Sequence, residues 1–529
     1  MNAIRLLLAV MICSAVQAAE EYESKVYRQV GEVSLSMRIY KPTDWKPSDS
    51  RPGIVFFFGG GWSGGSPDQF HEHCKYLAGR GMVALAADYR VKRRHETGPA
   101  DSTADAKAAV GWVREKAGKL GIDPSRVAAG GGSAGGHLAA ATATLGEGEE
   151  VPDVLVLFNP ALDLIYDPTY PKRKWNATVA EFKALSPFHT LDRTLPPTVI
   201  FHGTKDDAVP FPTIQAFAAK AKYVGADQVL VHAYEGRPHG FFNHGRGDGE
   251  DYRDTVGKMD RFLTKFGWLN WTVKTRKQVR AKGKETTKES TVNWKPQETA
   301  IIIVDMWNNH HCVSAARRVV ELAPHMNEVV KAARERGVFI IHAPSGCSDY
   351  YQDRTVRKNV AAAPLAKIDI HFQWNHFNPD KEGPLAEHLE KAGCSCDTPE
   401  ICGPDKRVWT HQIKAIEMAD IDAVSSNGQE IYNLLQQRGI KNVILMGVHT
   451  NRCVLGRPFG IRQMVYVGKN VVLCRDLTDS YHREPGKHFE GLAKIIRHVE
   501  TWWCPTITSE SITGARPFRF KEDLGDKVR

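Results

Sequence analysis

The residue with the clearest chemical potential is Ser133, at the centre of Gly131-Gly-Ser-Ala-Gly135. Residues 127–129 before it predict the end of a buried strand, and residues 134–144 after it predict a helix. A strand-to-helix turn this sharp needs small neighbours, and it holds the serine hydroxyl out at the edge of a sheet. The pattern therefore predicts a nucleophilic serine; the alternative is a glycine-rich loop with an incidental serine.

Three further segments share one design, a predicted strand followed at once by glycines or by a polar residue. They are 53–62, ending in Gly-Gly-Gly-Trp; 197–210, ending in Gly-Thr-Lys-Asp-Asp-Ala-Val-Pro; and 229–239, ending in Glu-Gly-Arg-Pro-His. Together with the turn at Ser133, these motifs resemble the esterases and lipases of the α/β-hydrolase family. The resemblance covers about residues 25–268.

The resemblance implies a catalytic triad in the chain order Ser, Asp, His. Ser133 would be the nucleophile, and His239 the general base that takes its proton. Asp206 would hold the imidazole of His239 in the required tautomer, with Asp207 as the alternative acid. A triad of this kind hydrolyses carboxylic esters through a covalent acyl-enzyme.

The resemblance also implies an oxyanion hole formed by the backbone N–H groups of Gly60, Gly61 and Ala134. Phe58 stands where the family usually has a histidine, so the means of holding this loop differs here. Residues 163–190 form the sizeable insertion before Asp206, and we expect them to act as a small lid. A small lid favours short acyl groups on bulky alcohols such as those of polysaccharides.

Composition and charge predict a globular protein of two or three domains. The chain has 529 residues, of which 42% are hydrophobic and 25% charged, with a formal net charge of +9. Residues 272–290 hold seven Lys or Arg against two Glu and show no apolar periodicity, so they read as a solvated linker. A nucleic-acid partner is disfavoured because no aromatic residues are interleaved with this charge; an anionic polysaccharide or envelope surface suits it better.

The first residues are typical of a secretory signal peptide. Arg5 precedes an apolar run that ends in Val-Gln-Ala18, which predicts cleavage after Ala18 and a secreted or periplasmic protein. No later run reaches the roughly 18 apolar residues that an integral membrane helix needs. Cleavage leaves nine of the ten cysteines, so at least one thiol stays unpaired within a monomer.

Three of these cysteines, Cys394, Cys396 and Cys402, stand in one short segment. A disulfide is favoured there over a zinc knuckle, because the compartment is oxidising and no C-x-x-C pair faces another. The sequence thus assigns no metal ligand, and we expect no cofactor.

A second alternation of strands and helices begins at Thr299 and predicts a parallel, three-layer α/β/α domain. Strand 300–304 ends in Asp305, and strand 442–448 runs into a turn that contains Cys453. These segments resemble the isochorismatase-like cysteine hydrolases. The resemblance implies a cis peptide at Val448-His449, and Asp305 as the acceptor of the Cys453 proton.

The chemistry of such a cysteine depends on its surroundings. A helix N-terminus next to Cys453 would lower the thiol pKa, and the sulfur would then attack an amide or related carbon. A buried structural cysteine is the alternative. The third catalytic residue of the family is a lysine, and Lys414 could fill that role. Alignment on strand 421–427 instead places Ser426 or Asn427 there, and three histidines could then substitute: His310, His311 and His449.

The predicted organisation has five parts: a signal peptide (1–18), an esterase domain (19–270), a basic linker (271–294), an isochorismatase-like domain (295–508) and a tail (509–529). The predicted function is an exported serine carboxylesterase with a second, cysteine-hydrolase-like domain. In the first alternative the C-terminal domain is an inactive binding or oligomerisation module; a homo-oligomer through that domain is expected by resemblance. A serine peptidase of the prolyl-oligopeptidase type ranks last, because too few residues precede the first core strand to build a β-propeller.

Overall fold

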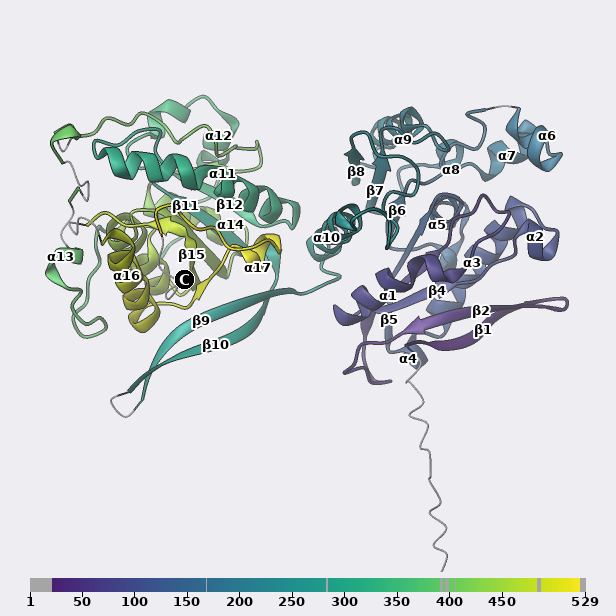
Figure 1. The fold of residues 1–529 in the computed structure, drawn as a ribbon, viewed down its shortest axis with the longest axis horizontal. Helices are drawn as coiled ribbons and strands as arrows, with labels where there is room; N and C mark the ends of the chain where they lie inside the picture. Colours follow the sequence, from purple (N-terminus) through teal and green to yellow (C-terminus); the bar gives the residue numbers. More distant parts are fainter. Residues whose placement is uncertain are drawn as a thin grey trace, which may run out of the picture. The chain divides into compact units, whose positions relative to one another are not determined.

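The computed structural model describes residues 21–523, except 168, 282–283, 391–392, 395–398, 405 and 483–486. It contains two compact units that divide between Val256 and Gly257, within helix α10 (Glu250–Lys265) (Figure 1). The expected signal peptide lies outside the described residues. Among the residues that are described, no helix has the length and apolar character needed to cross a membrane.

The N-terminal unit is built on an eight-stranded mixed sheet in the order β1-β2-β4-β3-β5-β6-β7-β8. An antiparallel hairpin is formed by β1 (Glu23–Val30) and β2 (Val33–Tyr40), and β2 pairs antiparallel with β4. The other six strands run parallel: β3 (Arg51–Phe57), β4 (Val83–Ala87), β5 (Ile122–Gly132), β6 (Val154–Phe158), β7 (Thr198–Gly203) and β8 (Val229–Tyr234). Their carboxyl ends therefore lie at one edge of the sheet.

Continuous apolar runs form the inner strands because both faces of the sheet are covered. On one face, Val55 and Leu85 pack with residues of α3 and α5. On the other face, ring contacts connect Phe56, Phe70 and Phe158. The helices of this unit are α1 (His71–Gly79), α2 (Lys92–His95), α3 (Pro99–Glu115), α4 (Ala117–Leu120), α5 (Ala134–Leu145), α6 (Tyr170–Trp175), α7 (Val179–Leu185), α8 (Pro187–Thr190) and α9 (Phe211–Tyr223).

The C-terminal unit has a second eight-stranded sheet in the order β10-β9-β16-β15-β14-β11-β12-β13. The strands from β16 to β13 are parallel, as the sequence predicts. The strands are β9 (Trp271–Ala281), β10 (Lys284–Trp294), β11 (Thr299–Val304), β12 (Phe339–Ala343), β13 (Ala423–Val424), β14 (Asn442–Val448), β15 (Asn470–Asp479) and β16 (Thr506–Ile507).

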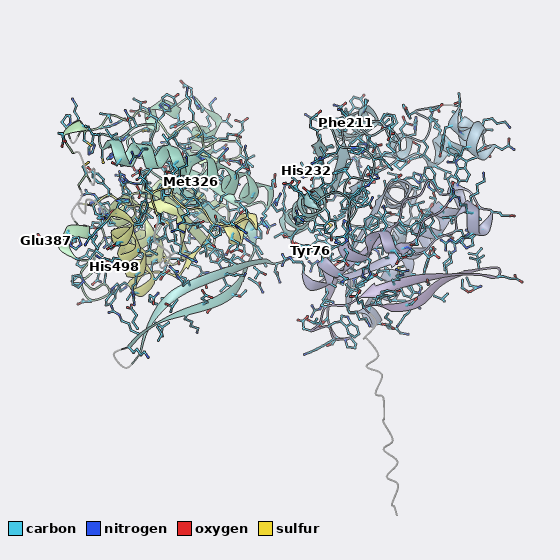
Figure 2. All side chains as sticks on the ribbon, in the orientation of Figure 1. Tyr76, Phe211, His232, Met326, Glu387 and His498 are labelled. Carbon is cyan, nitrogen blue, oxygen red and sulfur yellow. The ribbon has the colours of Figure 1, made fainter. Side chains whose placement is uncertain are left out.

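Helices cover both faces of this sheet and give the expected three layers. Met326 on α11 belongs to the core on one face, and His498 lies on α16, whose Ile496 belongs to the core on the other; Figure 2 labels Met326 and His498. The helices are α11 (Val313–Glu335), α12 (Thr355–Ala361), α13 (Glu387–Glu390), α14 (Gly428–Gln437), α15 (Ile461–Tyr466), α16 (His488–Trp502) and α17 (Glu510–Thr513).

The interpretation of residues 271–294 as a solvated linker is wrong. The segment forms a long antiparallel hairpin, β9–β10, whose first strand joins the sheet where Arg276 pairs with Thr506 (Figure 1). Trp271, Val273 and Thr275 are buried while Thr272 and Lys274 are exposed, so the start of β9 has a period of two that the high charge conceals. Part of that charge is paired, since Arg276 lies 2.7 Å from the buried carboxylate of Glu500.

The interpretation of residues 509–529 as a tail also needs correction over its described part. Phe518 and Phe520 are buried in the core of the C-terminal unit. The buried carboxylate of Asp476 accepts hydrogen bonds from the backbone N–H groups of Ser509 and Phe518. These contacts are long-range, and no local pattern in the sequence signals them.

Candidate active site

Ser133 occupies the predicted turn between β5 and α5. Its backbone has φ 54° and ψ −119°, an unfavourable conformation for a residue with a side chain. The turn closes only because Gly135 lacks a side chain: a Cβ there would lie 2.0 Å from the carbonyl oxygen of Phe57. The N–H of Ser133 donates to the carbonyl of Phe158 on β6, which ties the strained turn to the neighbouring strand.

The structure brings Ser133, His239 and Asp206 together from three different loops. The Nε2 atom of His239 lies 3.0 Å from the Oγ of Ser133, and its Nδ1 lies 2.7 Å from an Oδ2 of Asp206. A carboxylate only accepts hydrogen bonds, so Nδ1 carries the proton and the lone pair of Nε2 faces the serine hydroxyl. This is the arrangement that a general base requires.

The environment of Asp206 keeps it ionised. Its carboxylate is buried, which by itself would raise its pKa, but hydrogen bonds from His239 and the N–H of Val209 outweigh burial and lower the pKa. The N–H of Ala208 donates to the same oxygen as that of Val209. Asp207, the alternative acid, is exposed on the neighbouring position and lines the cavity instead.

The glycines predicted to form the oxyanion hole line the same cavity as Ser133 and Ala134. Gly60 has φ 124°, and a Cβ on it would lie 2.3 Å from the carbonyl oxygen of Gly64, so only glycine fits. The N–H of Gly59 is already used, since it donates to the Oε1 of Gln69 at 2.6 Å. Ala134 begins α5, and the first N–H groups of a helix have no acceptor within it.

The structure shows what holds the oxyanion loop in the absence of the usual histidine. The ring of Phe58 stacks on that of Tyr89 at 4.1 Å, and the hydroxyl of Tyr89 donates to the carbonyl of Phe58. On the other side, Gln69 donates to Asn243, which donates to the carbonyl of Gly240, the residue after His239. The sequence reasoning missed Gln69 and Asn243, because 174 positions separate them.

A cavity of about 840 Å³ opens around Ser133 and His239. Its wall includes two aromatic residues, Trp62 and Phe242, and charged groups such as Asp163 and Lys174. Residues of the insertion predicted as a lid contribute to this wall: Asp163, Leu164, Tyr166, Asp167, Tyr170 and Lys174. The insertion thus borders the serine, as expected.

The family comparison agrees with this geometry for the first half of the chain. A family model described as the alpha/beta hydrolase fold matches residues 54–243, which contain Gly60, Ser133, Asp206 and His239. The N-terminal half of the chain belongs to the α/β-hydrolase family. The matched range begins in β3 and ends shortly after the loop that carries His239.

Several relatives of this α/β-hydrolase are esterases. Esterase LipC of Mycobacterium tuberculosis is 29% identical over 221 residues, which cover 37% of this chain and 54% of the relative. Carboxylesterase NlhH of the same organism is 37% identical over 118 residues, covering 22% and 35%. The chain spans about half or less of the length of these curated relatives. A solved esterase of Thermogutta terrifontis, with propionate bound, is 48% identical at a TM-score of 0.45, covering 47% of this chain and 96% of that one.

Outside the α/β-hydrolase part, the C-terminal unit brings Asp305 and Cys453 together at the ends of neighbouring strands. Asp305 follows β11, and Cys453 lies in the turn Thr450–Val454 after β14, which pairs with β11. Both side chains are buried, and the charge of Asp305 contributes to raising the pKa of the Cys453 thiol. The peptide bond between Val448 and His449 is cis, as the resemblance implies.

The structure does not bring Lys414 to this pair. Lys414 is exposed, while Ser426 contacts the hydroxyl of Ser348 and Asn427 caps α14, so the assignment of the third catalytic residue stays a prediction. The cation beside the carboxylate is instead Arg457, whose Nε lies 2.9 Å from an Oδ of Asp305. Arg457 stands four positions after Cys453, which is one helical turn. A search of the sequence for a cation one turn from Cys453 could therefore have identified it.

The thiol of Cys453 is protonated at rest, contrary to the expectation from the helix N-terminus. Burial and the charge of Asp305 raise its pKa to about 12, although Arg457 opposes them. The histidines considered as substitutes gather nearby: the ring of His310 lies 4.1 Å from that of His311 and 5.0 Å from that of His449. Burial lowers the pKa of His449, so this ring is neutral at pH 7.

Proposed function

We propose that the N-terminal unit is a serine carboxylesterase in which Ser133, His239 and Asp206 form the triad. The observation that carries the proposal is the pair of contacts made by His239, 3.0 Å to the serine Oγ and 2.7 Å to the carboxylate. Ser133 and His239 line a cavity that is large enough for a small ester. The esterase names of the relatives support the same reaction.

In this mechanism His239 takes the Ser133 proton through Nε2 as the oxygen attacks the ester carbonyl. The N–H groups of Gly60, Gly61 and Ala134 stabilise the negative charge that develops on the carbonyl oxygen. His239 then gives the proton to the leaving alcohol. Water, deprotonated by the same nitrogen, attacks the acyl-enzyme and releases the carboxylic acid.

The substrate class we propose is a short acyl group on a polyhydroxylated alcohol, such as a carbohydrate. Trp62 and Phe242 offer an apolar wall that suits a short acyl chain. Asp163, Asp167 and Lys174 offer hydrogen-bonding groups that suit hydroxyls on the alcohol side.

The test is the hydrolysis of p-nitrophenyl esters by the full-length protein, with acyl chains from two to twelve carbons. Ser133→Ala should lower kcat/KM by at least about a thousandfold while the circular dichroism spectrum is unchanged. Ser125→Ala, an exposed serine, is the matched control and should retain wild-type rates. Retained activity in Ser133→Ala would refute the triad, and a maximum at twelve carbons would refute the short-acyl proposal.

A second candidate activity is favoured by the contacts of Cys453. We propose that the C-terminal unit is an isochorismatase-like cysteine hydrolase acting on a C–N bond, in which Arg457 supplies the cation that Lys414 does not. The Cys453 sulfur would attack the carbon while its proton passes to Asp305 and then to the leaving amine; water would hydrolyse the thioester. The Arg457–Asp305 contact of 2.9 Å supports this reading over an inactive module.

This second activity is tested in a Ser133→Ala background, which removes the esterase. A panel of small amides should be hydrolysed by this protein and not after the further change Cys453→Ala. The change Cys504→Ala is the control, since burial raises the pKa of this thiol to about 12 as well. If the Cys453→Ala and Cys504→Ala proteins hydrolysed the amides at equal rates, or if no protein hydrolysed them, the C-terminal unit would be better explained as a binding or oligomerisation module.

We also propose that the protein is exported, on the strength of the N-terminal sequence alone. Expressed with its leader in a bacterial host, the protein should be recovered from the periplasm with Ala19 as its first residue. Recovery from the cytoplasm with Met1 intact would refute this.

A further inference from the structure

Three cysteine sulfurs converge in the C-terminal unit, away from Cys453. The Sγ atoms of Cys312 and Cys394 lie 3.0 Å apart, and those of Cys394 and Cys402 lie 3.3 Å apart. All three sulfurs lie within 4.8 Å of one another. Cys312 is 82 positions from Cys394, so the fold itself assembles the group.

We propose that Cys312, Cys394 and Cys402 supply three of the four ligands of a structural zinc ion. Zinc bonds to thiolates at about 2.3 Å in a tetrahedral site, which sets neighbouring sulfurs roughly 3.7 Å apart. The separations of 3.0 and 3.3 Å are within an ångström of that spacing, and all three sulfurs lie within 4.8 Å of one another. They are too long for a disulfide, whose sulfurs are about 2.05 Å apart. A disulfide would also engage two of the sulfurs, whereas a zinc ion engages all three.

The surroundings suit thiolates, which are the form that binds metal. Cys312 immediately precedes the 23-residue helix α11, whose N-terminus carries partial positive charge. The N–H of Val313, in the first turn of this helix, donates to the Sγ of Cys402 at 3.4 Å. Three thiolates and a zinc ion carry a net charge of −1, which the N-terminus of α11 and this N–H group offset in part.

The position of the cluster indicates a structural role. Cys312 follows β11 by eight residues, and the intervening loop carries Asp305 at one end and His311 at the other. The side chain of His311 contacts the hydroxyl of Tyr481 at 2.7 Å, and its carbonyl accepts a hydrogen bond from the N–H of Gly403. A zinc ion would therefore fasten the segment around Cys402 to the loop that begins at Asp305. Each thiol releases one proton as it binds the metal.

The first test is the metal content of the purified full-length protein, measured by inductively coupled plasma mass spectrometry. We expect about one zinc ion per chain in the wild type and in the Cys504→Ala control. We expect less than a tenth of that in Cys312→Ser and Cys402→Ser. For each variant, hydrolysis of p-nitrophenyl acetate shows that the N-terminal unit is still folded.

The second test needs no variant of the cluster. Zinc should be released from the native wild-type protein by a mercurial reagent, and all cysteines should then react with a thiol reagent in denaturant. Cobalt(II) restored to the metal-free protein should give the charge-transfer absorption of cobalt–thiolate bonds. Absence of metal together with two unreactive cysteines would overturn the proposal in favour of a disulfide. Zinc that remains bound in the Cys312→Ser, Cys402→Ser double variant would place the metal elsewhere and also overturn it.

Discussion

The change Asp206→Asn gives a sharp test of the proposed esterase mechanism, because hydrogen bonds determine which way the new amide points. One carboxylate oxygen of Asp206 accepts from the N–H groups of Ala208 and Val209, at 3.0 and 2.8 Å. An asparagine must keep its carbonyl oxygen at that position, since its amide nitrogen would face two donors. Its NH₂ group therefore turns toward His239, where the other oxygen of Asp206 lies 2.7 Å from Nδ1.

This orientation reverses the tautomer of His239. An NH₂ group at Nδ1 makes that nitrogen an acceptor, so the proton moves to Nε2, which lies 3.0 Å from the Oγ of Ser133. A protonated Nε2 cannot take the serine proton. The same substitution in a serine protease lowers kcat by about 10⁴, which corresponds to about 5.4 kcal/mol of transition-state stabilisation. We expect a loss of the same order here.

The assay is steady-state hydrolysis of p-nitrophenyl acetate at pH 7.5, with kcat and KM determined separately. The loss should fall on kcat, because Asp206 does not contact the substrate. Asp207→Asn is the matched control: it removes the same charge one position along, from an exposed side chain, and should stay within about tenfold of the wild type. Retention of a tenth of the wild-type kcat by Asp206→Asn, or an equal loss in Asp207→Asn, would show that the tautomer argument is wrong.

Three further outcomes are expected. Gln69→Ala removes the bond to the N–H of Gly59 and should lower kcat by roughly ten- to a hundredfold with little change in KM, whereas an unchanged kcat would exclude a positioning role. Burial lowers the pKa of His137 to about 4, so the folded state binds fewer protons than the unfolded state. Stability should then fall as pH drops below about 6.5, by roughly 3 kcal/mol at pH 4, and the melting temperature of His137→Gln should vary less with pH. Alkylation of Cys453 by iodoacetamide should rise without a plateau up to pH 10, because its pKa is about 12; a plateau near pH 7 would contradict this.

Local requirements made much of the first site predictable. The turn at Ser133 needs small residues on both sides, and these residues stand within five consecutive positions, although the backbone of Phe57 on a neighbouring strand is what excludes a side chain at Gly135. The strand that precedes Asp206, β7, is a continuous buried run inside a parallel sheet, whereas β8, which precedes His239, is an edge strand and only partly buried. The residues that support the site were not predictable in this way, since Gln69 and Asn243 meet across 174 positions.

In the C-terminal unit, too, some features were predictable from the sequence and others were not. The alternation of strands and helices predicted its parallel sheet, and the motif around Cys453 predicted the neighbouring Asp305 and the cis peptide. The charge of residues 272–290 concealed a strand pattern, because lysine and arginine tolerate the exposed face of an edge hairpin. Lys414 had the right residue type, but its loop leaves it exposed to solvent.

By itself, the sequence determined the turn that presents Ser133, the order of the proposed triad and the presence of two α/β units. Each of these leaves a signature in consecutive residues, because backbone sterics and strand burial act locally. Only the tertiary structure decided that Arg457 accompanies Asp305, that residues 271–294 belong to a sheet, and that Cys312 meets Cys394 and Cys402. Each of these contacts joins residues that are far apart in the sequence. The chain contains many other side chains of the same types, and only the folded structure shows which of them meet.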